Sequence, residues 1–138
     1  MKIMKKQDNN SRHILTLNIP CSAEYLSFIR KISESVCSDL KMKSRDVEDI
    51  KVSITEVCSN SVKYSRGMQE LRIDFSQKKG RLLIYVKEQC KSVDMPEESV
   101  KCDSAGLGIY IIKKIMDDVK YELDTDYGTS VYMAKKII

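Results

Sequence analysis

Two stretches in the middle of the chain alternate between apolar and polar residues, and a short turn-like sequence separates them. Leu71, Ile73 and Phe75 alternate with polar residues, and the run 81–87 follows after Gln-Lys-Lys-Gly at 77–80. Alternation of this kind puts every second side chain on the same face of a β-strand. Two such strands joined by a turn predict an antiparallel hairpin that is buried on one face only. Other parts of the chain must therefore cover that face.

Three other segments repeat apolar residues at intervals of three and four, which places those residues on one side of an α-helix. The first helix is predicted to open near Ser22, where the hydroxyl can cap free backbone amides. The second is predicted to start after Ser44 and to run to about Tyr64, and the third is predicted to begin at Gly106. These helices are the natural cover for the hairpin.

Runs rich in aliphatic and β-branched residues predict three more strands, at 13–19, 119–125 and 129–137. Five strands and three helices in this order predict an α/β (α+β) fold. It is a two-layer sandwich in which one mixed, mostly antiparallel sheet is covered on one face by the three helices. We expect residues 1–12 to form a flexible leader and residues 13–138 to form a single domain, because a chain of 138 residues suits one hydrophobic core.

The composition excludes several classes of protein. No apolar stretch approaches the roughly 18 residues of a membrane-spanning helix and no export signal is seen, so we expect a soluble, cytoplasmic protein. The net charge of +4, from 24 basic and 20 acidic residues, is spread along the chain, which argues against a nucleic-acid-binding surface. One histidine, His13, leaves little material for a His-based triad or a multi-histidine metal site. The five cysteines include no Cys-x-x-Cys pair and are expected to be reduced thiols.

Glu56 and Asn60 form the first candidate site. They are four residues apart on the second predicted helix, so they differ by only about 40° around its axis. The pair lies on the flank of that helix, away from its apolar stripe. An asparagine oxygen suits magnesium, and a carboxylate can orient or deprotonate a hydroxyl group. A solvated helix surface is the alternative interpretation of this pair.

Glycines mark two further candidate sites. Gly106 and Gly108 lie where a long irregular segment, 88–105, meets the third predicted helix. Glycines there let backbone amides approach an anion, and the helix end adds partial positive charge, so phosphate is the predicted ligand. A flexible turn is the alternative. Gly128 and Thr129 lie between the last two strands, where an ordinary β-turn also accounts for them.

Taken in order, these features resemble the anti-sigma-factor serine kinases. That family belongs to the GHKL superfamily of ATPases, which includes gyrase, histidine kinases and mismatch-repair proteins. The resemblance extends from about His13 to Ile138 and includes the stretch GLGIYIIKKIMDDV followed by GTSVYMAKK. It implies an ATP-binding fold of the Bergerat type.

The resemblance also implies roles for single residues. Glu56 matches the family's catalytic glutamate, which acts as a base toward a serine hydroxyl on the protein substrate, and Asn60 matches the asparagine that binds magnesium. Gly106 and Gly108 match the glycines that receive the nucleotide phosphates. The long segment before them would be the lid over the nucleotide.

The adenine pocket is where the sequence departs from the family. Thr129, after Gly128, matches a residue that supports this pocket. An Asp-x-Gly-x-Gly box follows the second hairpin strand in the family, and its aspartate binds the adenine amino group. Here the acid is Glu88, and Cys90 and Ser92 replace the two glycines. ATP and magnesium are the implied cofactors, and side chains in place of glycine narrow or reshape the pocket if those positions need glycine.

Two functions follow from the resemblance and stay open at the level of sequence. One is an anti-sigma regulatory factor that binds a sigma factor and an antagonist protein and, if it holds ATP, phosphorylates the antagonist on serine. The other is a non-catalytic protein-binding switch of the same fold that has lost ATP binding. A homodimer is also implied, and no nucleic-acid or membrane partner is expected.

Overall fold

A computed structural model describes residues 11–63, 69–90, 103–124 and 128–138 of the chain. Its five strands form one sheet in the order β1-β2-β3-β5-β4, and every pair of neighbouring strands is antiparallel. The sheet comprises β1 (Ser11–Pro20), β2 (Gln69–Lys78), β3 (Arg81–Cys90), β4 (Asp118–Asp124) and β5 (Gly128–Lys136).

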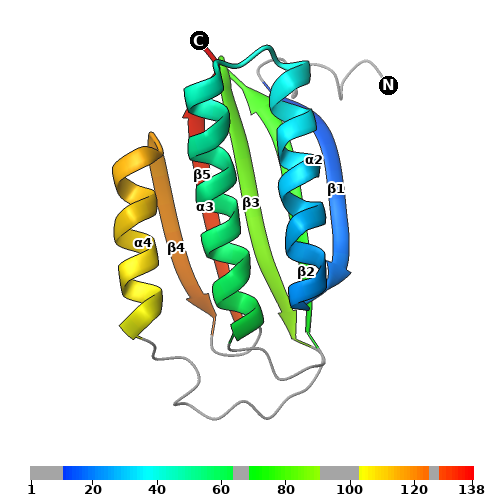
Figure 1. The fold of residues 1–138 in the computed structure, drawn as a ribbon, viewed down its shortest axis with the longest axis vertical. Coiled ribbons are helices and arrows are strands. Elements are labelled where there is room, and N and C mark those ends of the chain that lie inside the picture. Colours follow the sequence, from blue (N-terminus) through cyan, green and yellow to red (C-terminus); the bar gives the residue numbers. More distant parts are fainter. Residues whose placement is uncertain (1–10, 64–68, 91–102, 125–127) are drawn as a thin grey trace.

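Three α-helices lie side by side on one face of this sheet (Figure 1). They are α2 (Leu26–Asp39), α3 (Ser44–Lys63) and α4 (Asp103–Ile115), and a short 3-10 helix, η1 (Ala23–Tyr25), leads into α2. This is the predicted two-layer sandwich, with an antiparallel sheet and one helical layer. In the part of the chain that the structure describes, no helix is long and apolar enough to cross a membrane.

The core lies between the helices and the inner face of the sheet. The alternating residues of the hairpin are buried as predicted, with Leu71, Ile73, Phe75, Leu82 and Ile84 at most 1% exposed. They face fully buried residues of the helices, among them Ile29, Ile50, Ile54 and Ile112. Burial of these apolar side chains is the main force that holds the two layers together.

Lys79 and Gly80 form the turn of the predicted hairpin. Both residues have positive φ, 51° and 75°, as a two-residue type I′ turn requires. The strands pair in register from Lys78↔Arg81 at the turn to Gln69↔Cys90 at the far end.

Several element boundaries differ from the sequence prediction. β1 begins at Ser11, inside the predicted leader, because Ser11 and Arg12 pair with the end of β2. β3 continues to Cys90 because β2 offers it paired residues that far. α4 begins at Asp103, three residues before the predicted start at Gly106. Residues 1–10 of the predicted leader lie outside the described residues.

The chain direction of each helix and strand determines which of their ends lie together, and therefore where a site can form. At one end of the sandwich, the last residues of α3 and β3 meet the first residues of α4 and β5 (Figure 1). The β2–β3 turn, the connection from α2 to α3 and the end of β5 lie at the opposite end (Figure 1).

Candidate functional site

Glu56 and Asn60 of α3 lie directly against Gly108 of α4. A Cβ atom added to Gly108 would lie 2.6 Å from Oε2 of Glu56, 2.9 Å from its Cγ and 3.1 Å from Nδ2 of Asn60. The first distance is shorter than a non-bonded carbon–oxygen contact allows, and the second is shorter than a non-bonded carbon–carbon contact allows. Gly108 therefore lets the acid and the amide approach the backbone of α4, and the predicted pair faces another helix instead of open solvent.

The two glycines of α4 lie within the helix and not at its first residue. A helix leaves only its first four N–H groups without partners inside the helix. Because α4 begins at Asp103, the amide of Gly108 falls within the hydrogen-bonded part, and Gly106 stands at the limit of the free amides. Phosphate binding by both amides would thus require the first turn of α4 to unwind, whereas the steric role of Gly108 needs no such change.

Glu88 joins three elements through its carboxylate. It lies in β3, where Ser61 of α3 donates a hydrogen bond from Oγ to its Oε2 at 2.6 Å. The backbone N–H of Thr129 in β5 donates to the other oxygen, Oε1, at 3.1 Å. Glu88 and Thr129, which the sequence predicted to belong to one site, are therefore in direct contact. Gly128 precedes Thr129 as the first residue of β5.

The two groups of contacts adjoin along α3. Asn60 belongs to the contact with Gly108, and the next residue, Ser61, belongs to the contact with Glu88. The structure therefore gathers the predicted catalytic, magnesium and adenine residues at one end of the sandwich. Of the altered box, Cys90 ends β3. The predicted position Ser92 lies outside the described residues.

Ser61 is the site residue that the sequence reading missed. It is 4% exposed and lies seven, four and three residues after Ile54, Val57 and Cys58, so it continues their buried stripe. A serine in such a stripe signals a buried hydroxyl that needs a partner. The signal is not specific, since Ser53 is also fully buried and its hydroxyl has no hydrogen-bond partner among the described residues.

The thiol of Cys58 in α3 is not suited to nucleophilic catalysis or to metal binding. Burial raises the pKa of Cys58, and the nearby Cys21 and the negative charge of Glu88 raise it further. A thiol held in its neutral form is a poor nucleophile and a poor metal ligand. Cys58 therefore acts as packing beneath the site.

The described residues can hold a metal ion only together with ligands from outside the protein, such as substrate phosphates and water. They contain no group of three or more His, Cys, Asp or Glu side chains that could hold a metal. Magnesium in phosphoryl-transfer sites, however, is held by one or two protein groups together with substrate phosphates and water. Asn60 can supply one such oxygen, because its Nδ2 is the amide atom nearer Gly108 and its Oδ1 lies further from that glycine.

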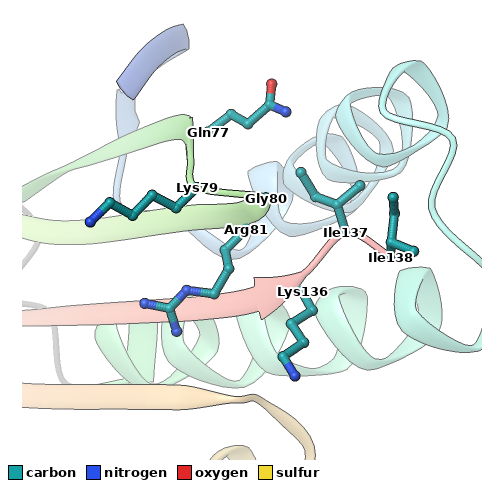
Figure 2. Close-up of a pocket in the computed structure, with 7 residues that line it drawn as sticks. All are labelled: Gln77, Lys79, Gly80, Arg81, Lys136, Ile137 and Ile138. Atoms are coloured by element: carbon teal, nitrogen blue, oxygen red, sulfur yellow. The ribbon is translucent and has the colours of Figure 1, made fainter. Parts of the chain in front are cut away.

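A hollow of about 340 Å³ lies at the opposite end of the sandwich, between the β2–β3 turn and the end of β5. Figure 2 shows that the charged ends of Lys79, Arg81 and Lys136 do not converge on a common point. Such a surface does not fit a small anion, which needs donors directed toward one place. None of the predicted site residues lines this hollow.

A family model described as the histidine kinase-like ATPase domain matches residues 19–135. The chain belongs to the histidine kinase-like ATPase family. The serine-protein kinase RsbW of Bacillus licheniformis is 28% identical to it over 136 residues, which cover 88% of this chain and 84% of that kinase. RsbW of Bacillus thuringiensis (strain Al Hakam) is 31% identical over 137 residues, covering 89% and 84% of the two chains. The resemblance to serine kinases of this family is confirmed.

Two solved structures share the fold. A chain in the crystal structure of the SiaB-SiaC complex from Pseudomonas aeruginosa matches with a TM-score of 0.61 and 11% identity, over 97% of this chain and 95% of that one. The histidine kinase domain of the blue-light activated histidine kinase from Erythrobacter litoralis EL346 matches with a TM-score of 0.54 and 17% identity, over 86% and 61%. These similarities confirm the architecture.

Proposed function

We propose that this protein is an anti-sigma regulatory factor of the bacterial cytoplasm that binds a sigma factor and an antagonist protein, and that it uses ATP to phosphorylate the antagonist on serine. Relatives that cover most of the chain are named as serine-protein kinases. The SiaB-SiaC neighbour was solved as a complex of two proteins. The observation that carries the proposal is the position of Glu56 and Asn60 against Gly108, next to a carboxylate held by Ser61 and Thr129.

The residues of the site divide the reaction between them. The serine oxygen of the antagonist attacks the γ-phosphorus of ATP, the bond from that phosphorus to the β–γ bridging oxygen breaks, and ADP leaves. The carboxylate of Glu56 takes the proton of the serine hydroxyl. Asn60 binds magnesium, which supplies positive charge to the phosphates. Glu88 accepts a hydrogen bond from the amino group of the base.

Thermal unfolding with and without magnesium-ATP tests the nucleotide half of the proposal. A ligand at about 100 times its dissociation constant stabilises the folded state by roughly 2.7 kcal/mol, so the unfolding temperature should rise by several degrees. Asn60→Ala should abolish the rise. Asn18→Ala is the matched control, because Asn18 is an exposed residue of β1, and it should leave the rise intact. An unchanged unfolding temperature in the unaltered protein would reject ATP binding.

Phosphate transfer to a serine of the antagonist tests the catalytic half. Glu56→Gln should abolish transfer while the protein still binds nucleotide, because the amide cannot accept the serine proton. Transfer at an unchanged rate in Glu56→Gln would reject the base role. The proposal also includes a homodimer, which sedimentation of the purified protein over a range of concentrations would detect.

A second function, a non-catalytic protein-binding switch, is favoured by one observation. Cys90 stands where the family has a glycine, and it pairs with Gln69 as the last residue of β3. A cysteine in a regular strand allows the backbone at this position fewer conformations than a glycine would. If the protein is such a switch, its complex with a sigma factor should form equally well with and without magnesium-ATP.

A further inference from the structure

Ser61 and Thr129 fix the carboxylate of Glu88 from two sides. The Oγ of Ser61 lies 2.6 Å from one carboxylate oxygen, and the Thr129 nitrogen lies 3.1 Å from the other. Hydrogen bonds to a charged acceptor are stronger than those between neutral groups. Because the donors come from α3 and β5, the carboxylate is held in one orientation by two separate elements.

Neither donor can move toward residue 88 if the side chain there is shortened. Ser61 is 4% exposed on a packed helix, and the N–H of Thr129 belongs to the backbone of a strand paired with β4. The pairing of β3 with β5 runs as far as Lys87↔Ser130, and the side chain of Glu88 takes up the next N–H along β5. The two donors therefore define a fixed place for a carboxylate.

Only a glutamate at position 88 reaches that place. Aspartate is shorter by one carbon–carbon bond, about 1.5 Å. From the same backbone position its oxygens would be drawn back from both donors, and the distances of 2.6 and 3.1 Å would lengthen beyond hydrogen-bonding range. The buried hydroxyl of Ser61 would then lose its acceptor.

We infer that Ser61 is a positioning residue for nucleotide selection, and that the site is built around a glutamate instead of the aspartate found in the family. The inference rests on the proposed ATP binding. Each carboxylate oxygen has two acceptor positions, so each keeps one after its bond to Ser61 or Thr129. The free positions accept a hydrogen bond from the exocyclic amino group of adenine. Restoring aspartate at position 88 therefore weakens the binding of ATP, and so does removing the hydroxyl of Ser61.

Binding of magnesium-ATP and magnesium-ITP by the full chain tests this inference. ITP carries an oxo group where ATP carries the amino group, so only ATP can donate to Glu88 from the 6-position of the base. The unaltered protein should bind ATP at least about tenfold more tightly than ITP, as expected for one hydrogen bond to a charged group. Ser61→Ala and Glu88→Asp should each weaken ATP binding by about tenfold and change ITP binding less.

Ser53→Ala is the matched control for Ser61→Ala. Both serines are buried on α3, but the hydroxyl of Ser53 has no hydrogen-bond partner in the part of the chain that the structure describes, so its loss should leave the ratio of ATP to ITP affinity unchanged. A merely structural effect of Ser61→Ala would weaken both nucleotides equally. Equal weakening, or tighter ATP binding by Glu88→Asp, would overturn the inference.

The same variants separate this inference from the proposed function. If the unaltered protein binds ATP but Ser61→Ala binds it as tightly, the positioning role is wrong and ATP binding stands. If the unaltered protein binds neither nucleotide, the proposed function fails, and the nucleotide role of Ser61 fails with it. A urea double-mutant cycle on Ser61→Ala and Glu88→Ala then checks the contact alone, and additive effects would show that the two side chains are not coupled.

Discussion

Gly108 shows how the absence of one side chain shapes the site. Alanine there would bring a methyl group to 2.6 Å from Oε2 and 2.9 Å from Cγ of Glu56. The helix itself would gain up to about 1 kcal/mol from the change to alanine. Overpacking costs roughly 1–3 kcal/mol. We therefore expect Gly108→Ala to destabilise the protein by about 1 kcal/mol in urea unfolding, because the clash outweighs the gain in helix propensity.

The background of Glu56→Ala provides the control for this prediction. Without the carboxylate and Cγ of Glu56, the two shortest contacts of the added methyl are removed and the next is Asn60 Nδ2, at 3.1 Å, so Gly108→Ala should become neutral or stabilising. An identical change in unfolding free energy in both backgrounds would show that the two residues do not touch.

Cys37 makes the stability depend on pH in the alkaline range. Burial, reinforced by the negative charges of Glu34 and Asp46, raises the pKa of its thiol from 9.0 to about 11. The folded state therefore favours the neutral thiol, and this contribution is complete below pH 9 and is lost as the pH rises to about 11. The loss amounts to roughly 2 kcal/mol.

Urea unfolding of the unaltered protein and of Cys37→Ala between pH 8 and pH 11 measures this contribution. The variant starts less stable because alanine leaves a small cavity. The difference between the two proteins should shrink as the pH rises above 9, since only the unaltered protein loses the stabilisation from Cys37. A constant difference over this range would contradict the prediction.

At the scale of elements, the β2–β3 turn carries a measurable backbone cost. Lys79 has φ of 51°, which a residue with a Cβ adopts only with strain, and Gly80 has φ of 75°. Lys79→Asn should stabilise the hairpin by a few tenths of a kcal/mol, because asparagine tolerates this region. Gly80→Ala should destabilise it by about 1 kcal/mol.

The space around Gly80 makes this test specific to the backbone. Apart from its two chain neighbours, no atom of the described residues lies within 4 Å of a Cβ added there, so packing against those residues contributes nothing to the effect of alanine. Unfolding free energies in urea should therefore change in opposite directions for the two variants. The same direction for both would exclude the type I′ assignment of the turn.

Elements whose pattern is local were predictable from the sequence. The hairpin followed from alternation around Gln-Lys-Lys-Gly, and α3 was placed within a residue of its observed ends. The end of β3 was not, because residues 88–90 join the sheet through their partners in β2 and not through their own pattern. The start of α4 was placed too late because Gly106 was taken as the boundary, although Asp103 and Ser104 are residues that favour helix starts.

The site was predictable only in part for the same reason. Helical spacing placed Glu56 and Asn60 on one flank of α3. The contact of Gly108 with that flank depends on how α3 and α4 pack, which no spacing within one helix contains. The bond between Ser61 and Glu88 joins residues 27 positions apart, and it could be found only once the fold was known.

At the scale of the whole molecule, Lys135 ties the two helices of the site to the sheet. It lies on β5 with a side chain only 11% exposed, and its Nζ is 3.2 Å from Oδ2 of Asp49 and 3.9 Å from Oδ1 of Asp46. The same ammonium donates a hydrogen bond to the carbonyl of Ile115 at the end of α4. One cation thus neutralises two acids in the first turns of α3 and binds a free carbonyl at the end of α4.

The loss of this cation should therefore loosen both helices at the end opposite the site. Removing one partner of a buried ion pair costs about 3–5 kcal/mol, and because Asp46 and Asp49 keep partial access to water we expect Lys135→Met to cost about 2 kcal/mol in urea unfolding. Lys136→Met is the matched control. The side chain of Lys136 is exposed, and the N–H that it donates to Asp117 belongs to the backbone, so its stability should change by less than about 0.5 kcal/mol. Equal effects of the two substitutions would mean that the helices are held to the sheet by apolar packing alone.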